Sequence, residues 1–409
     1  MANELSVGLG ELPQTKVAGG LSTAVQARVQ AAGRLLFMDN LRVFLTILVV
    51  LHHLAITYGA SGSWFYRERP TTELAGTLLS LFTLLNHFYF MGLFFLIAGY
   101  FVPGALDRKG PWQFLKDRLV RLGIPLVLYS FLISPFVLYV KGTQEGWWAG
   151  SLGQFVMMYW REVWFSPGPL WFVEALLIFT LAYVLGKAIL SRIQAHWVSR
   201  ASIASQRPLT HTRILALILL LAPISFAVRI FFPLDTEWGH FQLSMFPQYI
   251  FLFSVGILAY RRDWLPDLPR GVRHLWSVIA LLAMLSLPLY SVFSGALENP
   301  VPFQGGVTWQ SLVTALLEAI YCVSMSILLL GAFRLRLDRQ GRLGRLLSRN
   351  AYTVYIIHPA VLVGLAYALQ EVAIDPLLKY ALVAPAAVAL CFLASQFLVR
   401  RIPLAERVV

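Results

Sequence analysis

Charged residues are scarce in this chain of 409 residues, because Asp, Glu, Lys and Arg together make up only 13% of it. A soluble domain of average composition carries about 25% charged residues, so the chain has too little polar surface for a water-soluble fold of this size. Hydrophobic residues make up 58%, and they come in blocks of about 20, the length of a membrane-spanning helix. The composition predicts an all-α, polytopic membrane protein.

Cysteine is also rare. Cys322 and Cys391 both lie inside apolar blocks, and the chain has no Cys-x-x-Cys spacing, so neither a disulfide framework nor a metal site is expected. The first residues lack the short apolar core and cleavage site of a secretory signal. We therefore expect residues 1–35 to form a flexible cytoplasmic tail, with the first apolar block serving as an uncleaved signal anchor.

The apolar blocks predict about ten membrane helices within one membrane domain, 36–400, followed by a cytoplasmic tail at 401–409. The second block is too long for one straight crossing, so it should tilt or break, with Gly92, Gly99 and Pro103 as candidate sites. The sixth is short and can be partly re-entrant. The predicted helices are 36–58, 76–104, 120–140, 168–190, 213–232, 244–260, 274–294, 309–333, 350–370 and 377–399.

Positive charge is distributed unevenly along the chain, whose formal net charge is +13. With the N-terminus inside, 26 of the 33 Lys and Arg residues fall on the cytoplasmic side and five fall outside. This is the asymmetry of the positive-inside rule, and it predicts that both termini are cytoplasmic. The excess charge then faces anionic membrane lipid, so no nucleic-acid partner is needed to explain it. We expect a multi-pass protein of the inner (plasma) membrane.

Ionisable residues inside membrane helices cost roughly 2.5–3.5 kcal/mol on insertion scales, so each needs an explanation. The first helix carries Asp39, Arg42 and His53. Eleven residues make three turns plus about 20°, which puts Arg42 and His53 on one face, about 16 Å apart. His52 points about 80° away. An ion pair beside an isolated histidine is the structural alternative, but three groups on one face favour a polar cavity with a cation at one end and a base deeper inside.

Other polar residues in the apolar blocks are as readily structural as functional when taken singly: Asn86, His87, Glu174 and His358. Arg229 and Glu318 have a weaker claim to function, because one can neutralise the other or each can reach the interface.

Two further groups lie near the predicted membrane surfaces. Arg118 and Arg121 are three residues apart at the cytoplasmic end of a helix, where they suit bidentate binding of phosphate but also ordinary positive-inside charge. Aromatic residues crowd one outer segment, where an interfacial belt is the better explanation and a sugar-stacking surface the alternative. They are Trp147, Trp148, Tyr159, Trp160, Trp164 and Trp171.

Five segments in order resemble acyltransferase family 3, the integral membrane O-acyltransferases. The resemblance covers most of residues 36–400 and is greatest to the branch of glucan-biosynthesis acyltransferases. The first segment is Asp39-x-x-Arg42-x(10)-His53. The others are Met91–Phe101, Phe114–Pro125 with its Arg118-x-x-Arg121, Gly168–Phe172, and Ala351–His358.

The resemblance implies transfer of an acyl group, such as acetyl or succinyl, from cytoplasmic acyl-CoA to a hydroxyl of an extracytoplasmic carbohydrate or related acceptor. His53, or its neighbour His52, would be the general base or acyl relay. Arg42, oriented by Asp39, would bind the donor together with Arg118 and Arg121. Glu174 would act on the acceptor hydroxyl, and the acceptor would contact Asn86, His87, Trp171 and His358.

Some family members carry an attached periplasmic hydrolase-like domain, so we expect any second transfer step here to use a separate extracytoplasmic partner protein. Two other classes remain open from the residues alone. A transporter or flippase for a sugar or anionic metabolite often shows internal repeats, which this sequence lacks. A non-catalytic scaffold has little reason to bear the cost of a shared ionisable face.

Overall fold

The computed structural model describes residues 35–69, 71–194, 208–234, 236–265 and 268–402. Within these ranges the chain is helical with connecting turns, and the only β-bridge joins Trp238 to Phe241. The predicted all-α class is therefore confirmed. The predicted tails fall outside the described residues, apart from Leu35 at one end and residues 401–402 at the other.

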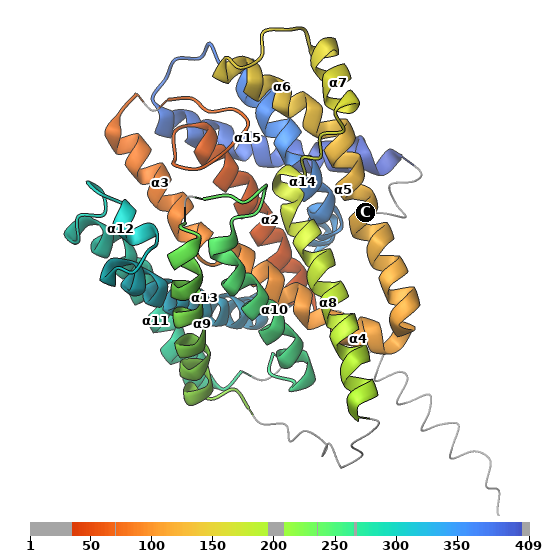
Figure 1. Ribbon diagram of the computed structural model, residues 1–409, viewed down its shortest axis with the longest axis vertical. Helices are drawn as coiled ribbons and strands as arrows, with labels where there is room; N and C mark the ends of the chain where they lie inside the picture. Colours follow the sequence, from red (N-terminus) through yellow and green to blue (C-terminus); the bar gives the residue numbers. More distant parts are fainter. Residues whose placement is uncertain (1–34, 70, 195–207, 235, 266–267, 403–409) are drawn as a thin grey trace, which may run out of the picture.

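The helices form one bundle in which α2 runs through the middle and the short α7 and α12 lie at its periphery (Figure 1). Their bounds are α2 Leu36–Thr57, α3 Glu73–His87, α4 Phe90–Arg118, α5 Ile124–Leu128, α6 Ser134–Glu145, α7 Leu152–Arg161, α8 Trp171–Gln194, α9 His211–Phe231, α10 Phe246–Arg261, α11 Arg270–Phe293, α12 Val301–Gln304, α13 Trp309–Arg336, α14 Arg342–Ala368 and α15 Pro376–Phe397.

Nine helical runs in the described part of the chain are long and apolar enough to cross a membrane. One of them, Glu73–Glu145, has 73 residues, about 110 Å of helix, and it contains both predicted helices 76–104 and 120–140. The chain reverses at Gly110, whose φ of 74° suits glycine. The sixth predicted helix corresponds to Leu243–Arg261, which is long enough to cross without being re-entrant.

The second predicted helix breaks at Phe88–Tyr89, between α3 and α4, and not at Gly92, Gly99 or Pro103. The break is supported from α10, where the Gln248 side-chain amide donates to the Phe88 carbonyl at 2.8 Å. In lipid a broken helix is tolerated only where a neighbouring group satisfies the freed backbone. The sequence of the second helix alone does not contain that neighbour, which is why the position was predicted wrongly.

The glycines of α4 serve close helix packing instead. A Cβ on Gly99 would lie 2.2 Å from the Phe253 carbonyl oxygen, and a Cβ on Gly256 would lie 2.1 Å from the Leu96 carbonyl oxygen. The backbones of α4 and α10 therefore touch through glycine on both sides. Small residues at such crossings are the usual means of tight helix association in membranes.

The predicted helix 120–140 is irregular, with π-helical segments η1 Leu119–Gly123 and η2 Tyr129–Ile133. Proline removes the N–H that would bond to the carbonyl four residues earlier, so Pro125 and Pro135 release the carbonyls of Arg121 and Phe131. Side chains from other helices donate hydrogen bonds to both of these carbonyls. The Tyr352 hydroxyl of α14 donates to Arg121, and the Trp160 indole of α7 donates to Phe131, each at 2.9 Å. These prolines thus convert bonds within a helix into bonds between helices.

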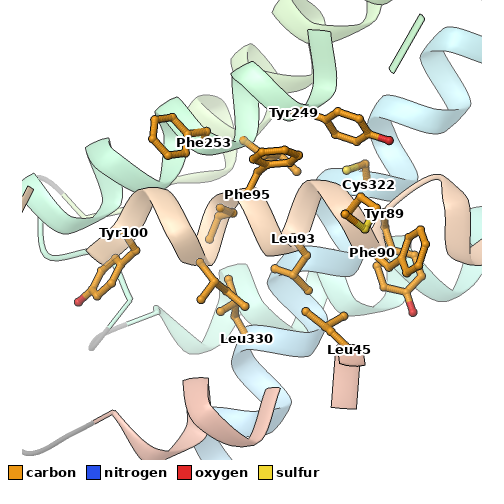
Figure 2. Close-up of a cluster of buried hydrophobic side chains, with 14 of the residues drawn as sticks. Leu45, Tyr89, Phe90, Leu93, Phe95, Tyr100, Tyr249, Phe253, Cys322 and Leu330 are labelled. Atoms are coloured by element: carbon orange, nitrogen blue, oxygen red, sulfur yellow. The ribbon is translucent and has the colours of Figure 1, made fainter. Parts of the chain in front are cut away.

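The largest core cluster surrounds α4. Figure 2 shows Phe95 facing Tyr249 and Phe253 on one side of α4 and Leu93 facing Leu45 on the other. The Phe95 and Tyr249 rings stack with centroids 5.1 Å apart. A second cluster lies between α2, α14 and α15. Both cysteines are buried free thiols, so the predicted absence of a disulfide is confirmed for them.

Candidate active site

His53 and His358 meet where α2 packs against α14. His53 Nδ1 lies 3.1 Å from His358 Nε2, and the ring centroids are 5.1 Å apart with a tilt of 22°. The two residues are 305 positions apart in the chain. The sequence singled out both but gave no reason to join them, because His358 was expected to contact the acceptor.

The hydrogen-bond pattern fixes which ring nitrogens carry protons when both imidazoles are neutral. Pro359 has no N–H to bond the Tyr355 carbonyl, and His358 Nδ1 lies 2.7 Å from that oxygen. A carbonyl only accepts, so His358 Nδ1 carries the proton and His358 Nε2 is the acceptor. His53 Nδ1 must then donate to it. The lone pair of His53 is therefore on Nε2, ready to accept a proton or attack a carbonyl carbon.

His52 has a different environment from His53. It is buried, its ring stacks on Phe90 with centroids 5.0 Å apart, and its Nδ1 has no hydrogen-bond partner among the described residues. His53 is only partly buried. Partial exposure and a fixed tautomer therefore coincide at His53, the histidine that the spacing from Arg42 selects.

Trp64 covers His53, with parallel rings whose centroids are 4.0 Å apart and whose planes are tilted by 16°. It comes from the loop between α2 and α3 and is 6% exposed. Sequence reasoning missed this residue, because a tryptophan just outside a membrane helix is most simply explained as part of an interfacial belt.

Asp39 and Arg42 form an ion pair at the opposite end of α2. The Asp39 side chain is buried, the Arg42 side chain is 44% exposed, and the guanidinium also lies 5.3 Å from the Phe101 ring centroid. The carboxylate and the ring together hold the guanidinium in one place while leaving part of it accessible. This is an arrangement that can bind an anionic ligand.

Arg118 and Arg121 do not share a regular α-helical face, because α4 ends at Arg118 and Arg121 lies in the π-helical segment η1. The two guanidinium groups are nevertheless within electrostatic range of each other. Arg118 also lies over the Phe114 ring at 5.2 Å. The pair is anchored to α14 through the bond from Tyr352 to the Arg121 carbonyl.

Glu174 lies in the first turn of α8, and its partner is His240 rather than His53. Glu174 Oε2 is 2.7 Å from His240 Nε2, with side chains 23% and 33% exposed. The rings of Phe165 and Phe241 lie beside His240, at 6.1 and 4.4 Å. His240 was not predicted, since nothing in the sequence of the loop after α9 signals a contact with the earlier helix α8.

The remaining predicted acceptor residues are dispersed. Trp171 packs on Tyr249 in the core, with ring centroids 5.3 Å apart. Asn86 is buried next to the helix break, and its Nδ2 has no partner among the described residues. His87 follows it and interacts with Gln242. Asn86 and His87 thus lie at the C-terminal end of α3, whereas Trp171 packs in the aromatic core beside α4 and α10.

Arg229 and Glu318 form a buried ion pair between α9 and α13, with side chains 0% and 3% exposed. The structure therefore shows the mutual neutralisation that the sequence suggested as one explanation for these two residues. Across the described residues, no group of three His, Cys, Asp or Glu side chains is arranged to hold a metal ion.

Comparison with known proteins gives one strong family match. The family model described as "Acyltransferase domain" matches residues 35–396. "Glucans biosynthesis protein C" of Escherichia coli (strain K12) is 30% identical over 153 residues, and the protein of that name from Escherichia coli O1:K1 / APEC matches equally. Each match covers 36% of this chain and 38% of the relative, so the relatives are spanned over little more than a third of their length.

No solved structure matches the chain. The family model, however, covers nearly all of the membrane domain that the sequence predicts, and the helical runs are those of a polytopic membrane protein. The chain belongs to acyltransferase family 3 and is a multi-pass membrane acyltransferase.

Proposed function

We propose that the protein moves an acyl group, such as acetyl or succinyl, from cytoplasmic acyl-CoA to a hydroxyl of an extracytoplasmic carbohydrate or related acceptor. The observation that supports this best is the His53–His358 pair, because it leaves an unprotonated imidazole nitrogen inside a membrane bundle. The name of the Escherichia coli relatives favours a glucan as acceptor. We place the enzyme in the inner (plasma) membrane, with both termini cytoplasmic.

In the direct reaction, His53 Nε2 takes the proton of the acceptor hydroxyl as the oxygen attacks the thioester carbonyl carbon. The new C–O bond forms and the C–S bond breaks. The proton then passes from His53 to the leaving thiolate, which gives ester and free CoA. In the relayed reaction, the same Nε2 lone pair attacks the thioester first, so that a C–N bond forms and the C–S bond breaks with release of CoA thiolate. The acceptor hydroxyl then attacks the acyl carbon, the C–N bond breaks, and the hydroxyl proton passes to the thiolate, which again gives ester and free CoA. Both routes need the tautomer described above.

The donor would bind from the cytoplasmic end. Arg42 would contact phosphate groups of CoA with Arg118 and Arg121, since guanidinium binds phosphate in bidentate fashion. Asp39 would keep the Arg42 guanidinium in position. The distance of about 16 Å from Arg42 to His53 then requires a long donor whose thioester lies far from its phosphates, as acyl-CoA does.

The acceptor would approach from the other end of α2. Glu174, with His240, would bind or polarise a hydroxyl there, and Asn86, His87 and Trp171 would line the inner end of the path. His358 would act on the acceptor only through His53, as a positioning residue. A separate extracytoplasmic partner protein would carry out any later transfer step.

The test uses purified protein in proteoliposomes, with labelled acyl-CoA on the side of the termini and glucan oligosaccharide on the other side. Wild type should acylate the glucan, and His53→Gln should lower the rate by about 10²–10⁴-fold, the usual worth of a general base. His52→Gln is the matched control and should retain most of the activity. The opposite result for the two variants would reassign the base to His52.

Two further outcomes would contradict the proposal. One is normal transfer by correctly folded variants of both histidines, His53→Gln and His52→Gln, which would contradict the histidine mechanism. The other is uptake of a sugar or anion by the wild-type protein without any acyl donor, together with no acyl transfer, which would favour the transporter alternative.

A further inference from the structure

The loop Tyr58–Arg69, between α2 and α3, folds back over the end of α2. Three consecutive aromatic residues in it, Trp64, Phe65 and Tyr66, are buried at 6–8% exposure. His53 lies only one turn before the end of α2 at Thr57, about 6 Å along the axis. The loop therefore separates His53 from the side by which we expect the acceptor to arrive.

The loop is held at several points along its length. Near its start, the loop is bonded to α3 through Ser61 and Ser80. The Ser61 backbone N–H donates to Ser80 Oγ at 2.9 Å, and the two hydroxyl oxygens are 3.1 Å apart. Near the end of the loop, the Glu68 carboxylate accepts two hydrogen bonds from Lys379 of α15, at 2.8 and 2.9 Å. The Lys379 side chain is 3% exposed. These contacts keep Trp64 against His53.

Trp64 is stacked on the imidazole, but its own polar group is unused. The indole Nε1–H is buried and has no partner among the described residues. A buried tryptophan N–H usually finds an acceptor, and an unmet donor is costly. The flat ring and the free N–H are together the chemistry that recognises a sugar, through stacking and a hydrogen bond to a hydroxyl oxygen.

We propose that Trp64 determines the choice between a carbohydrate hydroxyl and water as acyl acceptor. While acyl-CoA is bound and no carbohydrate is present, the stacked indole excludes water from His53. The incoming carbohydrate displaces the indole from His53 and receives its N–H as a hydrogen bond. This inference rests on the proposed function and adds to it the residue that sets acceptor specificity.

The side reaction that Trp64 would suppress is hydrolysis. In it the oxygen of water bonds to the acyl carbon, the C–S bond breaks, and the water proton passes through His53 to the thiolate. The products are a free carboxylic acid and CoA. Excluding water from a closed site is a general means of preventing such losses.

The first test measures acyl-CoA hydrolysis and glucan acylation side by side in proteoliposomes. Trp64→Ala should raise the ratio of hydrolysis to transfer by about tenfold or more, because water then reaches the base. Trp64→Phe keeps the flat ring and loses the N–H, so it should keep hydrolysis low while weakening use of the acceptor. Trp309→Ala is the matched control, since Trp309 is 61% exposed, and its ratio should equal that of wild type.

An unchanged ratio in Trp64→Ala, in protein that melts cooperatively, would overturn the inference while leaving the acyltransferase proposal intact. Absence of any acyl-CoA turnover in wild type would overturn both. The Trp64→Phe variant covers the case in which the alanine variant fails to fold.

The second test locks the loop. The Ser61 and Ser80 oxygens are 3.1 Å apart, close enough for Ser61→Cys with Ser80→Cys to form a disulfide, and the two native thiols are buried. The oxidised protein should lose glucan acylation by about tenfold or more and recover it on reduction, while acyl-CoA still raises its Tm. Ser80→Cys alone is the control. Full acylation by the oxidised protein would show that the loop does not move and would overturn the inference.

Discussion

The Arg229–Glu318 pair and the His53–His358 pair differ in charge and in exposure. Arg229 and Glu318 carry opposite charges and are almost completely buried. His53 and His358 are of one type, are joined through a single hydrogen bond, and leave His53 partly exposed. In a buried pair of opposite charges each side chain neutralises the other, and the burial of both closes this pair to substrate. A neutral imidazole pair with one open nitrogen has a reactive atom available.

The presence of an ionisable residue in a membrane helix is thus a weak indicator of function, and the identity of its partner is a stronger one. In the sequence, Glu318 and His358 are both ionisable residues of a kind that is rare in membrane helices. In the structure, one neutralises an arginine and the other positions a histidine. Variants of both pairs and of their neighbours test that distinction.

Glu318→Ala should leave the Arg229 guanidinium buried without a counter-charge and destabilise the protein by about 3–5 kcal/mol. The expected result is a large drop in Tm in detergent, or failure to accumulate in the membrane. The double variant Arg229→Met, Glu318→Leu removes both charges and should restore folding and activity. If the double variant folds but does not transfer acyl groups, the ion pair belongs to the catalytic region and the comparison fails.

Arg42→Ala should raise KM for acyl-CoA roughly tenfold or more, since a charged hydrogen bond contributes about 1.5–3 kcal/mol. The acyl-CoA-dependent rise in Tm should shrink in parallel. Arg345→Ala is the matched control, because Arg345 is exposed on the same expected side of the membrane. A fall in kcat with unchanged KM would mean that Arg42 acts in the chemical step and not in donor binding.

His358→Ala should lower kcat by about 10–100-fold, as loss of a group that orients a histidine commonly does, with little change in KM for acyl-CoA. The reason is that His53 Nδ1–H loses its acceptor and the tautomer is no longer fixed. His358→Gln offers a carbonyl oxygen at a similar position and should recover part of the rate. Equal damage from both variants would indicate that His358 touches substrate directly.

Tyr352→Phe should have the smallest effect, a loss of about 0.5–1.5 kcal/mol in stability. It removes the hydroxyl that bonds the Arg121 carbonyl and leaves His53 and His358 untouched, so kcat should remain close to wild type. Tyr367→Phe, at a residue that is 54% exposed, is the control for Tm. A large loss of activity with unchanged Tm would place Tyr352 in the donor site.

Hydropathy and charge predicted the helical class and nearly every helix, because the bilayer imposes length and apolarity on each segment separately. The features that hydropathy and charge did not predict depend on contacts with a second segment of the chain. The break at Phe88–Tyr89 relies on Gln248 of α10, and Glu174 finds its partner in a loop at His240. Such contacts have no local signature.

The candidate site shows the same division. Asp39, Arg42 and His53 share one helix, so the helical period alone places them on one face. The contact of His53 with His358 joins positions 305 residues apart. The stacking of Trp64 on His53 requires the loop between α2 and α3 to fold inward. A single sequence without its tertiary contacts predicts the first arrangement and cannot predict the other two.

The prolines that release backbone carbonyls also bear on when the protein becomes active during its synthesis. A helix can form in the bilayer as soon as its own residues have entered it, but a released carbonyl is satisfied only when its partner helix arrives. The Arg121 carbonyl can be bonded, and the tautomer of His53 can be fixed, only after α14 has inserted. The reason is that their partners, Tyr352 and His358, are both on α14. A nascent chain that has inserted α2 but not yet α14 therefore contains His53, the proposed base, without the partner that fixes its tautomer. We expect acyl transfer to begin only after α14 has inserted.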